Sequence, residues 1–169
     1  MLPLILPLLL AADPALIVPT RQNPPRPVHC GDDCISPVEA VTYASYLAPK
    51  AGIAGTFRMK VKAVGEQKGI YYLNSETDYR DRNCLTIAMP AAVMAELARG
   101  EGLAAAEKRF KGRTIMVRGV AQRVRISFFD DAGKPTDKYY YQVQVRIGRS
   151  EQIAPRSGYI NDKELSQNP

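Results

Sequence analysis

Two segments that lie far apart in the chain alternate between apolar and polar residues. Between Phe57 and Lys62, apolar residues occupy the odd positions and cations occupy the even positions. Between residues 139 and 147 the odd positions are aromatic or aliphatic, and the even positions hold Tyr140, Gln142, Gln144 and Arg146. Because successive side chains of a strand point to opposite faces, each segment predicts a strand with an apolar face toward a barrel interior and a polar face toward solvent.

The rest of the chain predicts three further strands and a helical region. Alternation and turn residues place the five predicted strands at residues 53–64, 70–74, 84–89, 114–129 and 138–147. Residues 91–110 are rich in Ala, Glu, Leu and Lys and predict a helix, which Gly100 and Gly102 divide into two pieces. The predicted order is therefore three strands, a helix and two strands.

One more helix is predicted ahead of the first strand. Ser36 and Glu39 have the spacing of a capping box, and Pro37 occupies the first helical position between them. The helix is predicted over residues 37–47, and Pro49 ends it. This places a helical segment at residues 36–50, before a β-rich domain at residues 51–153.

The beginning of the chain predicts export. Residues 2–12 contain only Leu, Ile, Pro and Ala, and the small residues Ala11 and Ala12 suit a signal-peptidase site, so residues 1–12 predict a signal peptide. Prolines and Asp13 interrupt the apolar run, which argues against a membrane span. Residues 13–35 are predicted to be a proline-rich linker and residues 154–169 a flexible tail. The expected location is periplasmic or secreted.

The three cysteines become meaningful if the protein is exported. Cys30 and Cys34 are disulfide candidates that would close a small loop, although pairing of either one with Cys84 stays open. His29 and the nearby carboxylates offer ligand atoms for zinc, but no second Cys/His pair follows at the spacing of a zinc site. No metal site and no cofactor are therefore predicted.

The charge balance favours anionic ligands. The chain has 23 Lys and Arg against 17 Asp and Glu, a formal charge of +6. Such an excess attracts nucleic acid, acidic lipid head groups or acidic polysaccharide, although it also serves solubility alone. Catalytic patterns are weaker: His29 is the one histidine, so no serine or cysteine triad can be built, and no glycine-rich phosphate loop is present.

An acidic cluster in the connection between the second and third predicted strands has two interpretations. Glu76, Asp78 and Asp81 could coordinate a cation such as Ca²⁺. Arg80 and Arg82 alternate with these carboxylates, which favours local salt bridges instead.

Three short runs carry a family resemblance: residues 69–74 (GIYYLN), 78–81 (DYRD) and 111–119 (KGRTIMVRG). Together with the element order, they resemble bacterial OB-fold domains of DNA-related or exported proteins. The resemblance implies a five-stranded Greek-key barrel over residues 51–153, with a helix between strands three and four and an added N-terminal helix. It also implies that the face of strands two and three binds oligonucleotides or oligosaccharides.

The candidate ligand-binding residues are cations, amides and tyrosines at outward positions, because single-stranded nucleic acid needs cations and aromatic faces. They are Arg58, Lys60, Lys62, Tyr72, Asn74, Arg123, Arg125, Tyr140, Gln142 and Arg146, and Gln144 also occupies an outward position. Adjacent strands one, four and five would join the cations into one basic wall, although solvated strand faces also carry Lys and Arg to discourage edge pairing. Tyr139 and Tyr141 are predicted to cap the core, with their hydroxyls at the rim.

The sequence therefore predicts a non-catalytic exported domain that binds a polyanionic or oligomeric ligand, either single-stranded nucleic acid or an acidic saccharide. One alternative is a cell-envelope protein-interaction module that does not bind nucleic acid. A second alternative is a metal-dependent hydrolase.

Overall fold

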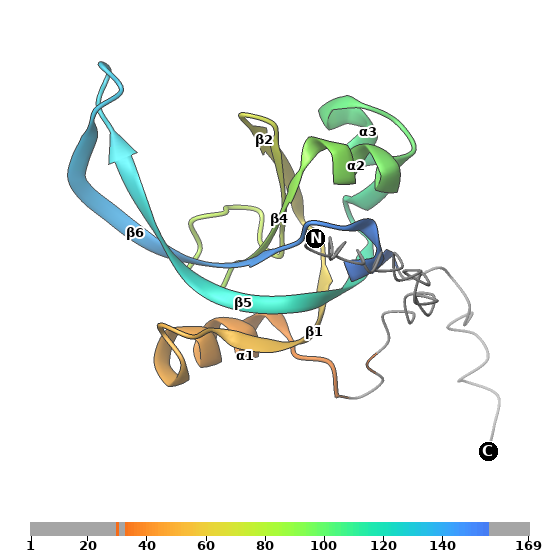
Figure 1. Ribbon diagram of the computed structural model, residues 1–169, viewed down its shortest axis with the longest axis horizontal. Coiled ribbons are helices and arrows are strands. Elements are labelled where there is room, and N and C mark those ends of the chain that lie inside the picture. Colours follow the sequence, from red (N-terminus) through yellow and green to blue (C-terminus); the bar gives the residue numbers. More distant parts are fainter. Residues whose placement is uncertain (1–29, 31–32, 156–169) are drawn as a thin grey trace, which may run out of the picture.

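The computed structural model describes Cys30 and residues 33–155 of the 169-residue chain, and this part folds mainly as β-sheet (Figure 1). The predicted signal peptide, most of the predicted linker and most of the predicted tail lie outside the described residues. The strands are β1 (Ile53–Lys60), β2 (Ala63–Gln67), β3 (Ile70–Asn74), β4 (Leu85–Pro90), β5 (Thr114–Phe129), β6 (Pro135–Arg146) and β7 (Ile153–Pro155).

Helices occur before β1, between β4 and β5, and before β7. They are α1 (Pro37–Thr42), the π-helix η2 (Tyr43–Leu47), α2 (Ala91–Ala98), α3 (Gly102–Phe110) and the 3-10 helix η3 (Ser150–Gln152). The predicted division of the 91–110 helix is confirmed. The chain leaves α2 through Arg99 in the left-handed conformation and enters α3 at Gly102, whose φ is +81°.

The strands form one mixed sheet with the order β1-β5-β6-β4-β3-β2, and β7 pairs with β5 beside this path. β4 and β6 run parallel, and the other pairs are antiparallel. The mainly β class is confirmed, but the closed five-stranded barrel is not what the structure has: it has a seven-stranded open sheet. The difference arises because the first predicted strand is two strands, β1 and β2, at opposite ends of the sheet, and because β7 is added.

The break between β1 and β2 is a change of partner at Val61 and Lys62. Val61 N–H donates to the carbonyl of Arg113, and Gly112 N–H donates to the carbonyl of Val61, so this residue stays beside the start of β5. Lys62 N–H donates to the carbonyl of Asn74 in β3. Two consecutive residues thus hydrogen-bond to opposite ends of the sheet order.

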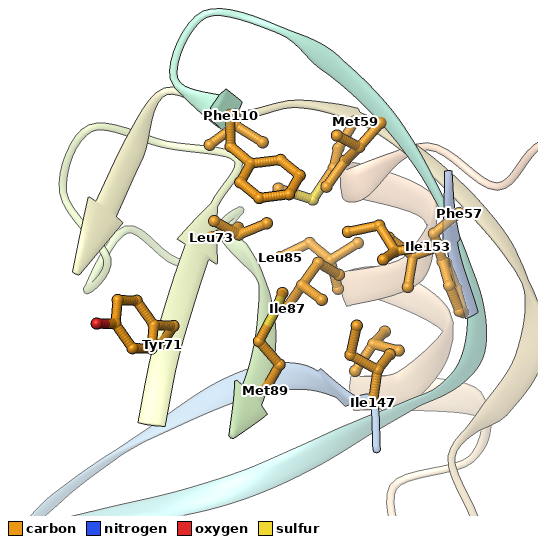
Figure 2. Close-up of a cluster of buried hydrophobic side chains, with 14 of the residues drawn as sticks. Phe57, Met59, Tyr71, Leu73, Leu85, Ile87, Met89, Phe110, Ile147 and Ile153 are labelled. Carbon is orange, nitrogen blue, oxygen red and sulfur yellow. The ribbon is translucent and has the colours of Figure 1, made fainter. Parts of the chain in front are cut away.

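The core lies on the inward face of this sheet and is closed by helices. Phe57, Met59 and Val61 are at most 2% exposed, which confirms the inward face predicted for this segment. Figure 2 shows Phe57 and Met59 with other core side chains from β3, β4, α3 and β7, and with Ile147 just after β6. Full burial of each large apolar side chain contributes about 1.5–3 kcal/mol. The remaining large, fully buried side chains are Phe110, Leu73, Leu85, Ile87, Met89, Met94, Ile115, Val117 and Val145.

The N-terminal helix begins as its sequence predicts. Ser36 Oγ accepts from Glu39 N–H at 3.4 Å, and Glu39 Oε2 accepts from Ser36 N–H at 2.8 Å, which completes a capping box. Ala40 in α1 and Ala44 in η2 are fully buried in the core cluster. Just before the helix, Ile35 pairs with β1: its N–H donates to Thr56, and its carbonyl accepts from Arg58 N–H.

β5 and β6 continue beyond the rest of the sheet as a curved two-stranded hairpin, which we call the arm (residues 122–142; Figure 1). β1 pairs with β5 only as far as Ala121, and β4 pairs with β6 only from Val143 onward. Within the described residues, no third strand pairs with the arm. Its two faces therefore have surroundings different from those of the core strands.

The described cysteines differ in state. Cys30 and Cys34 form a disulfide with their Cα atoms 5.0 Å apart, and Cys84 is a buried free thiol. Among the described helices, none combines the length and apolar character needed to cross a membrane.

Candidate functional site

A cavity of about 550 Å³ lies between the arm and strands β2 and β3. Its lining combines aromatic rings and side-chain amides: Tyr72, Asn74, Tyr79, Phe128, Tyr140, Gln142 and Gln144. The curvature of the arm toward β2 makes this enclosure possible (Figure 1). Concave sites with convergent polar groups are the usual places for ligands.

A second cavity of about 340 Å³ adjoins the first and shares Tyr72 and Gln144 with it. The register places Tyr72 of β3 beside Ala88 of β4, and Ala88 beside Arg146 of β6. The small side chain of Ala88 thus lies between a phenol ring and a guanidinium group. We call the two cavities together the groove.

The floor of the groove is a row of polar side chains across three strands. Asn74 in β3 is paired with Thr86 in β4, and Thr86 is paired with Gln144 in β6. Thr86 Oγ1 donates to Asn74 Oδ1 at 2.8 Å, and Gln144 Nε2 donates to Gln142 Oε1 at 2.7 Å. Buried polar groups normally need such partners, and Asn74 and Gln144 are each only 5% exposed.

These hydrogen bonds leave one end of two buried amides unused. Asn74 Nδ2 and Gln144 Oε1 have no hydrogen-bond partner within the part of the chain that the structure describes. Both residues line the first cavity. The floor can therefore offer a donor from Asn74 and an acceptor from Gln144 to a bound molecule.

A hydrogen bond from Gln142 positions the loop between β3 and β4 over the groove. Gln142 Nε2 donates to the carbonyl of Tyr79 at 2.8 Å. Inside the loop, Asp78 Oδ1 accepts from Arg80 N–H, and Asp81 Oδ1 accepts from Asn83 N–H. These carboxylates therefore stabilise turns, and the described residues contain no group of three or more candidate metal ligands.

Aromatic rings form the sides of the groove. The ring centres of Phe128 and Tyr140 are 5.6 Å apart, and the rings are tilted by 46°. The two strands of the arm, β5 and β6, thus contact each other through these rings on the groove side. Arg80 lies 5.1 Å from the centre of the Tyr79 ring, and its Nε donates to the Tyr79 hydroxyl at 3.1 Å.

Tyr140 and Arg80 each keep one protonation state at neutral pH. Burial raises the pKa of Tyr140 above its ordinary value of 10.0, so its hydroxyl stays protonated and can donate a hydrogen bond. The hydrogen bond to Tyr79 raises the pKa of Arg80, which stays cationic. The groove thus presents the neutral phenol of Tyr140, with a cation at the Tyr79 side.

The structure brings together part of the predicted site. Five of the predicted residues line the groove with Gln144: Tyr72, Asn74, Tyr140, Gln142 and Arg146. Gln142 and Gln144 are 8% and 5% exposed, so their predicted solvent-facing positions were wrong. The outward face of β6 is covered at this point by the loop that Gln142 holds.

The predicted basic wall does not form as one surface. Arg58 and Lys60 are exposed on β1, opposite Met116 and Thr114 of β5, and neither lines the groove. Lys62 forms an ion pair with Glu76 at 2.5 Å. Three of the predicted cations therefore do not line the groove, although Lys62 is bonded through its backbone to Asn74.

The remaining two cations lie on the face of the arm that is turned away from the groove. Arg123 and Arg125 share the pleat side of Ala121, whereas Tyr140 and Gln142 occupy the other side. Tyr139 and Tyr141 are 48% and 47% exposed, so the prediction that they belong to the core was wrong. Their side of the arm continues the core face past the point where a covering layer ends.

Sequence reasoning missed Tyr79 and Phe128 as groove residues. Tyr79 lies in a charged connection whose path depends on the distant Gln142. A signal for Phe128 was present, because two consecutive phenylalanines in a regular strand would place one ring on each face. The structure has a register shift between Ser127 and Phe129, and both phenylalanines line the first cavity. Both are more than 40% exposed in the structure.

Comparisons with known proteins add no family to this geometry: no protein-family model matches the chain, and no curated protein sequence matches it.

Proposed function

We propose that the chain is related in architecture to the OB-fold domains that its sequence resembles. The support is the connectivity of the sheet. β1 and β2 stand at opposite ends of the strand order yet are joined through Val61 and Lys62, and helices lie between β4 and β5. If β1 and β2 count as one bent strand, the order becomes the five-stranded arrangement that the resemblance implies.

Within this proposal, the groove is a non-catalytic binding site for an extended, oligomeric ligand. The observation that carries it is the pair of nearly buried amides, Asn74 and Gln144, whose unused ends line a cavity flanked by aromatic rings. No fully buried side-chain nitrogen or oxygen of the described residues lacks a hydrogen-bond partner, so the unused ends of these amides are open to the cavity. A ligand that hydrogen-bonds to both amides replaces water there and gains specificity. Rings such as Tyr72 offer flat faces for stacking.

Two ligand classes fit this chemistry: single-stranded nucleic acid and an acidic saccharide. Both are oligomeric and carry hydrogen-bonding groups along an extended chain, and both are attracted by a formal charge of +6. Bases would stack on the tyrosine rings, whereas sugar rings would pack their apolar faces on them. Arg146 and Arg80 would meet the anionic groups of either ligand.

We further propose that the protein acts in the periplasm or outside the cell. The support is the apolar run at residues 2–12 and the disulfide between Cys30 and Cys34, because disulfides persist in oxidising compartments.

An alternative function is an envelope module that docks another protein. One observation favours it: Tyr46 and Leu47 at the end of η2 are 80% and 73% exposed. Exposed apolar side chains that cluster on one element can form a protein contact.

The test is binding of two fluorescent probes, a single-stranded oligothymidylate and an oligogalacturonate, to the full chain and to Tyr72→Ala and Tyr140→Ala. Loss of one stacking ring costs about 1–3 kcal/mol, so we expect affinity for the preferred probe to fall about fivefold to 150-fold. Tyr46→Ala removes an equal ring outside the groove and should bind like the wild type. The groove proposal is wrong if neither probe binds or if all three variants bind alike.

A further inference from the structure

Arg123, Arg125, Tyr139 and Tyr141 form an alternating set on the face of the arm opposite the groove, which we call the arginine–tyrosine ladder. In the register of the hairpin, Arg125 is paired with Tyr141, Arg123 with Val143, and Ser127 with Tyr139. Each arginine reaches diagonally across the strand pair to the ring one step closer to the tip of the arm. The ladder is therefore built by two adjacent strands and does not depend on a flexible loop.

The contacts inside the ladder fix the guanidinium groups. Cζ of Arg123 lies 3.5 Å from the centre of the Tyr141 ring, and Cζ of Arg125 lies 4.2 Å from the centre of the Tyr139 ring. The two rings are 5.5 Å apart and edge-to-face, at 78°. A stacked guanidinium loses little further freedom when it binds, because its position is already restricted.

The charges of the ladder are not neutralised by the rest of the described chain. The guanidinium groups of Arg123 and Arg125 form no hydrogen bond and no ion pair with any described residue. Both rings are about half exposed. A guanidinium group has five N–H donors in a planar fork that matches phosphate, so the ladder leaves two such forks free.

We propose that the ladder is a second binding site, separate from the groove, and that it binds the phosphodiester backbone of single-stranded nucleic acid. The two arginines are two residues apart on one strand, about 6.7 Å along it, so they can contact successive phosphates of an extended chain. Guanidinium planes and tyrosine rings also stack bases, which an acidic saccharide does not possess. This combination favours nucleic acid over a carboxylate polymer. The ladder lies on the face of the arm opposite the groove, so this proposal does not depend on which ligand the groove binds.

The experiment measures anisotropy of a labelled oligothymidylate with the full chain over a series of salt concentrations. Each phosphate contact in a single strand contributes about 0.7 to the slope of log K against log salt. Arg123→Ala/Arg125→Ala should therefore lower the slope by about 1.4. The matched control Arg58→Ala/Lys60→Ala removes the same charge from exposed positions on β1 and should leave the slope unchanged. Equal losses in the two double variants, or none in the first, would overturn the proposal.

A conservative pair separates stacking from charge. Arg123→Lys/Arg125→Lys keeps both charges and removes the planar forks, so it should weaken oligothymidylate binding and keep binding of inorganic polyphosphate. The proposal is contradicted if oligothymidylate binds this variant as tightly as the wild type. It is also contradicted if oligogalacturonate binds with the same dependence on the two arginines.

Failure of the groove can be told apart from failure of the ladder. Tyr72→Ala changes only the groove, so the slope that depends on Arg123 and Arg125 should persist in it. If Tyr72→Ala abolishes all oligothymidylate binding while the arginine variants keep the wild-type slope, the groove proposal stands and the ladder is rejected.

Discussion

The two halves of the β5–β6 pair follow one alternation of side chains, but the same side of the pair is buried in one half and exposed in the other. Near the core, Ala121, Val143 and Val145 occupy the odd positions and are at most 3% exposed. In the arm the same side of the same strands carries arginines and half-exposed tyrosines. The pleat decides which residues share a side, but the layer packed against that side decides whether it becomes a core. α1, which contacts β1, β4 and β5, supplies that layer only near the core.

The sharpest way to break this comparison is to truncate one isoleucine in each half of β5. Ile115 is fully buried, so Ile115→Ala should lower the free energy of unfolding by about 2–5 kcal/mol, because it leaves a cavity in the core. Ile126 is partly exposed in the arm, and Ile126→Ala should cost about 1 kcal/mol or less. Urea denaturation of the two variants measures both values. Equal losses would show that the arm is packed as tightly as the core.

A second test adds one methyl group to the part of β5 near the core, where the side chains are tightly packed. A Cβ atom at Gly119 would lie 2.6 Å from Val145 Cγ1, and Val145 is fully buried. Gly119→Ala should therefore cost about 1–3 kcal/mol through overpacking. Gly148→Ala is the control, since a Cβ atom there meets nothing within 4 Å. A thermal melt of Gly119→Ala that matches the wild type would mean that β6 can shift away from β5.

The smallest expected effect of a substitution on stability concerns α1, the helix that covers the β5–β6 pair near the core. Ser36→Ala removes a capping side chain whose hydrogen bond to Glu39 N–H is long at 3.4 Å, so the cost should be about 0.5–1 kcal/mol. The loss should appear in thermal melts near neutral pH. Thr42→Ala, an exposed residue of the same helix, should leave the melting temperature nearly unchanged. A larger loss in Thr42→Ala would contradict the role given to the cap.

The same cap predicts a pH dependence. Hydrogen bonds from the Ser36 side chain, and then from its backbone N–H, lower the pKa of Glu39 below 4.5. A carboxyl group with a lowered pKa stabilises the folded state above pH 4.5, and this contribution is lost as the pH falls through the lowered value. Glu39→Gln should therefore flatten the acid side of the melting-temperature profile. An unchanged profile would contradict it.

Much of the fold could be predicted from the sequence, because its signals are local. The strand positions, the capping box at Ser36 and the helix division near Gly100 follow from residues close together in the chain. The break between β1 and β2 could not be predicted, since it depends on hydrogen bonds to Arg113 and Asn74.

The candidate site was predicted less well than the fold. Tyr72 and Asn74 were identified from alternation within one strand, and they line the groove. Arg123 and Arg125 were assigned to the wrong face, although their odd numbers match those of the buried Val117 and Ala121. The sequence shows this parity but not where the covering layer ends. The contribution of Tyr79 depends on a hydrogen bond between residues 63 positions apart.

The hydrogen bond from Gln142 to Tyr79 joins the arm to the loop through two uncharged groups. An amide and a peptide carbonyl do not titrate, and mobile ions screen their attraction far less than they screen an ion pair. The width of the groove should therefore stay constant while the ionic strength of the solution changes. A salt series on this protein then reports the ions displaced from the ligand and the cations it meets, rather than the opening of the binding site.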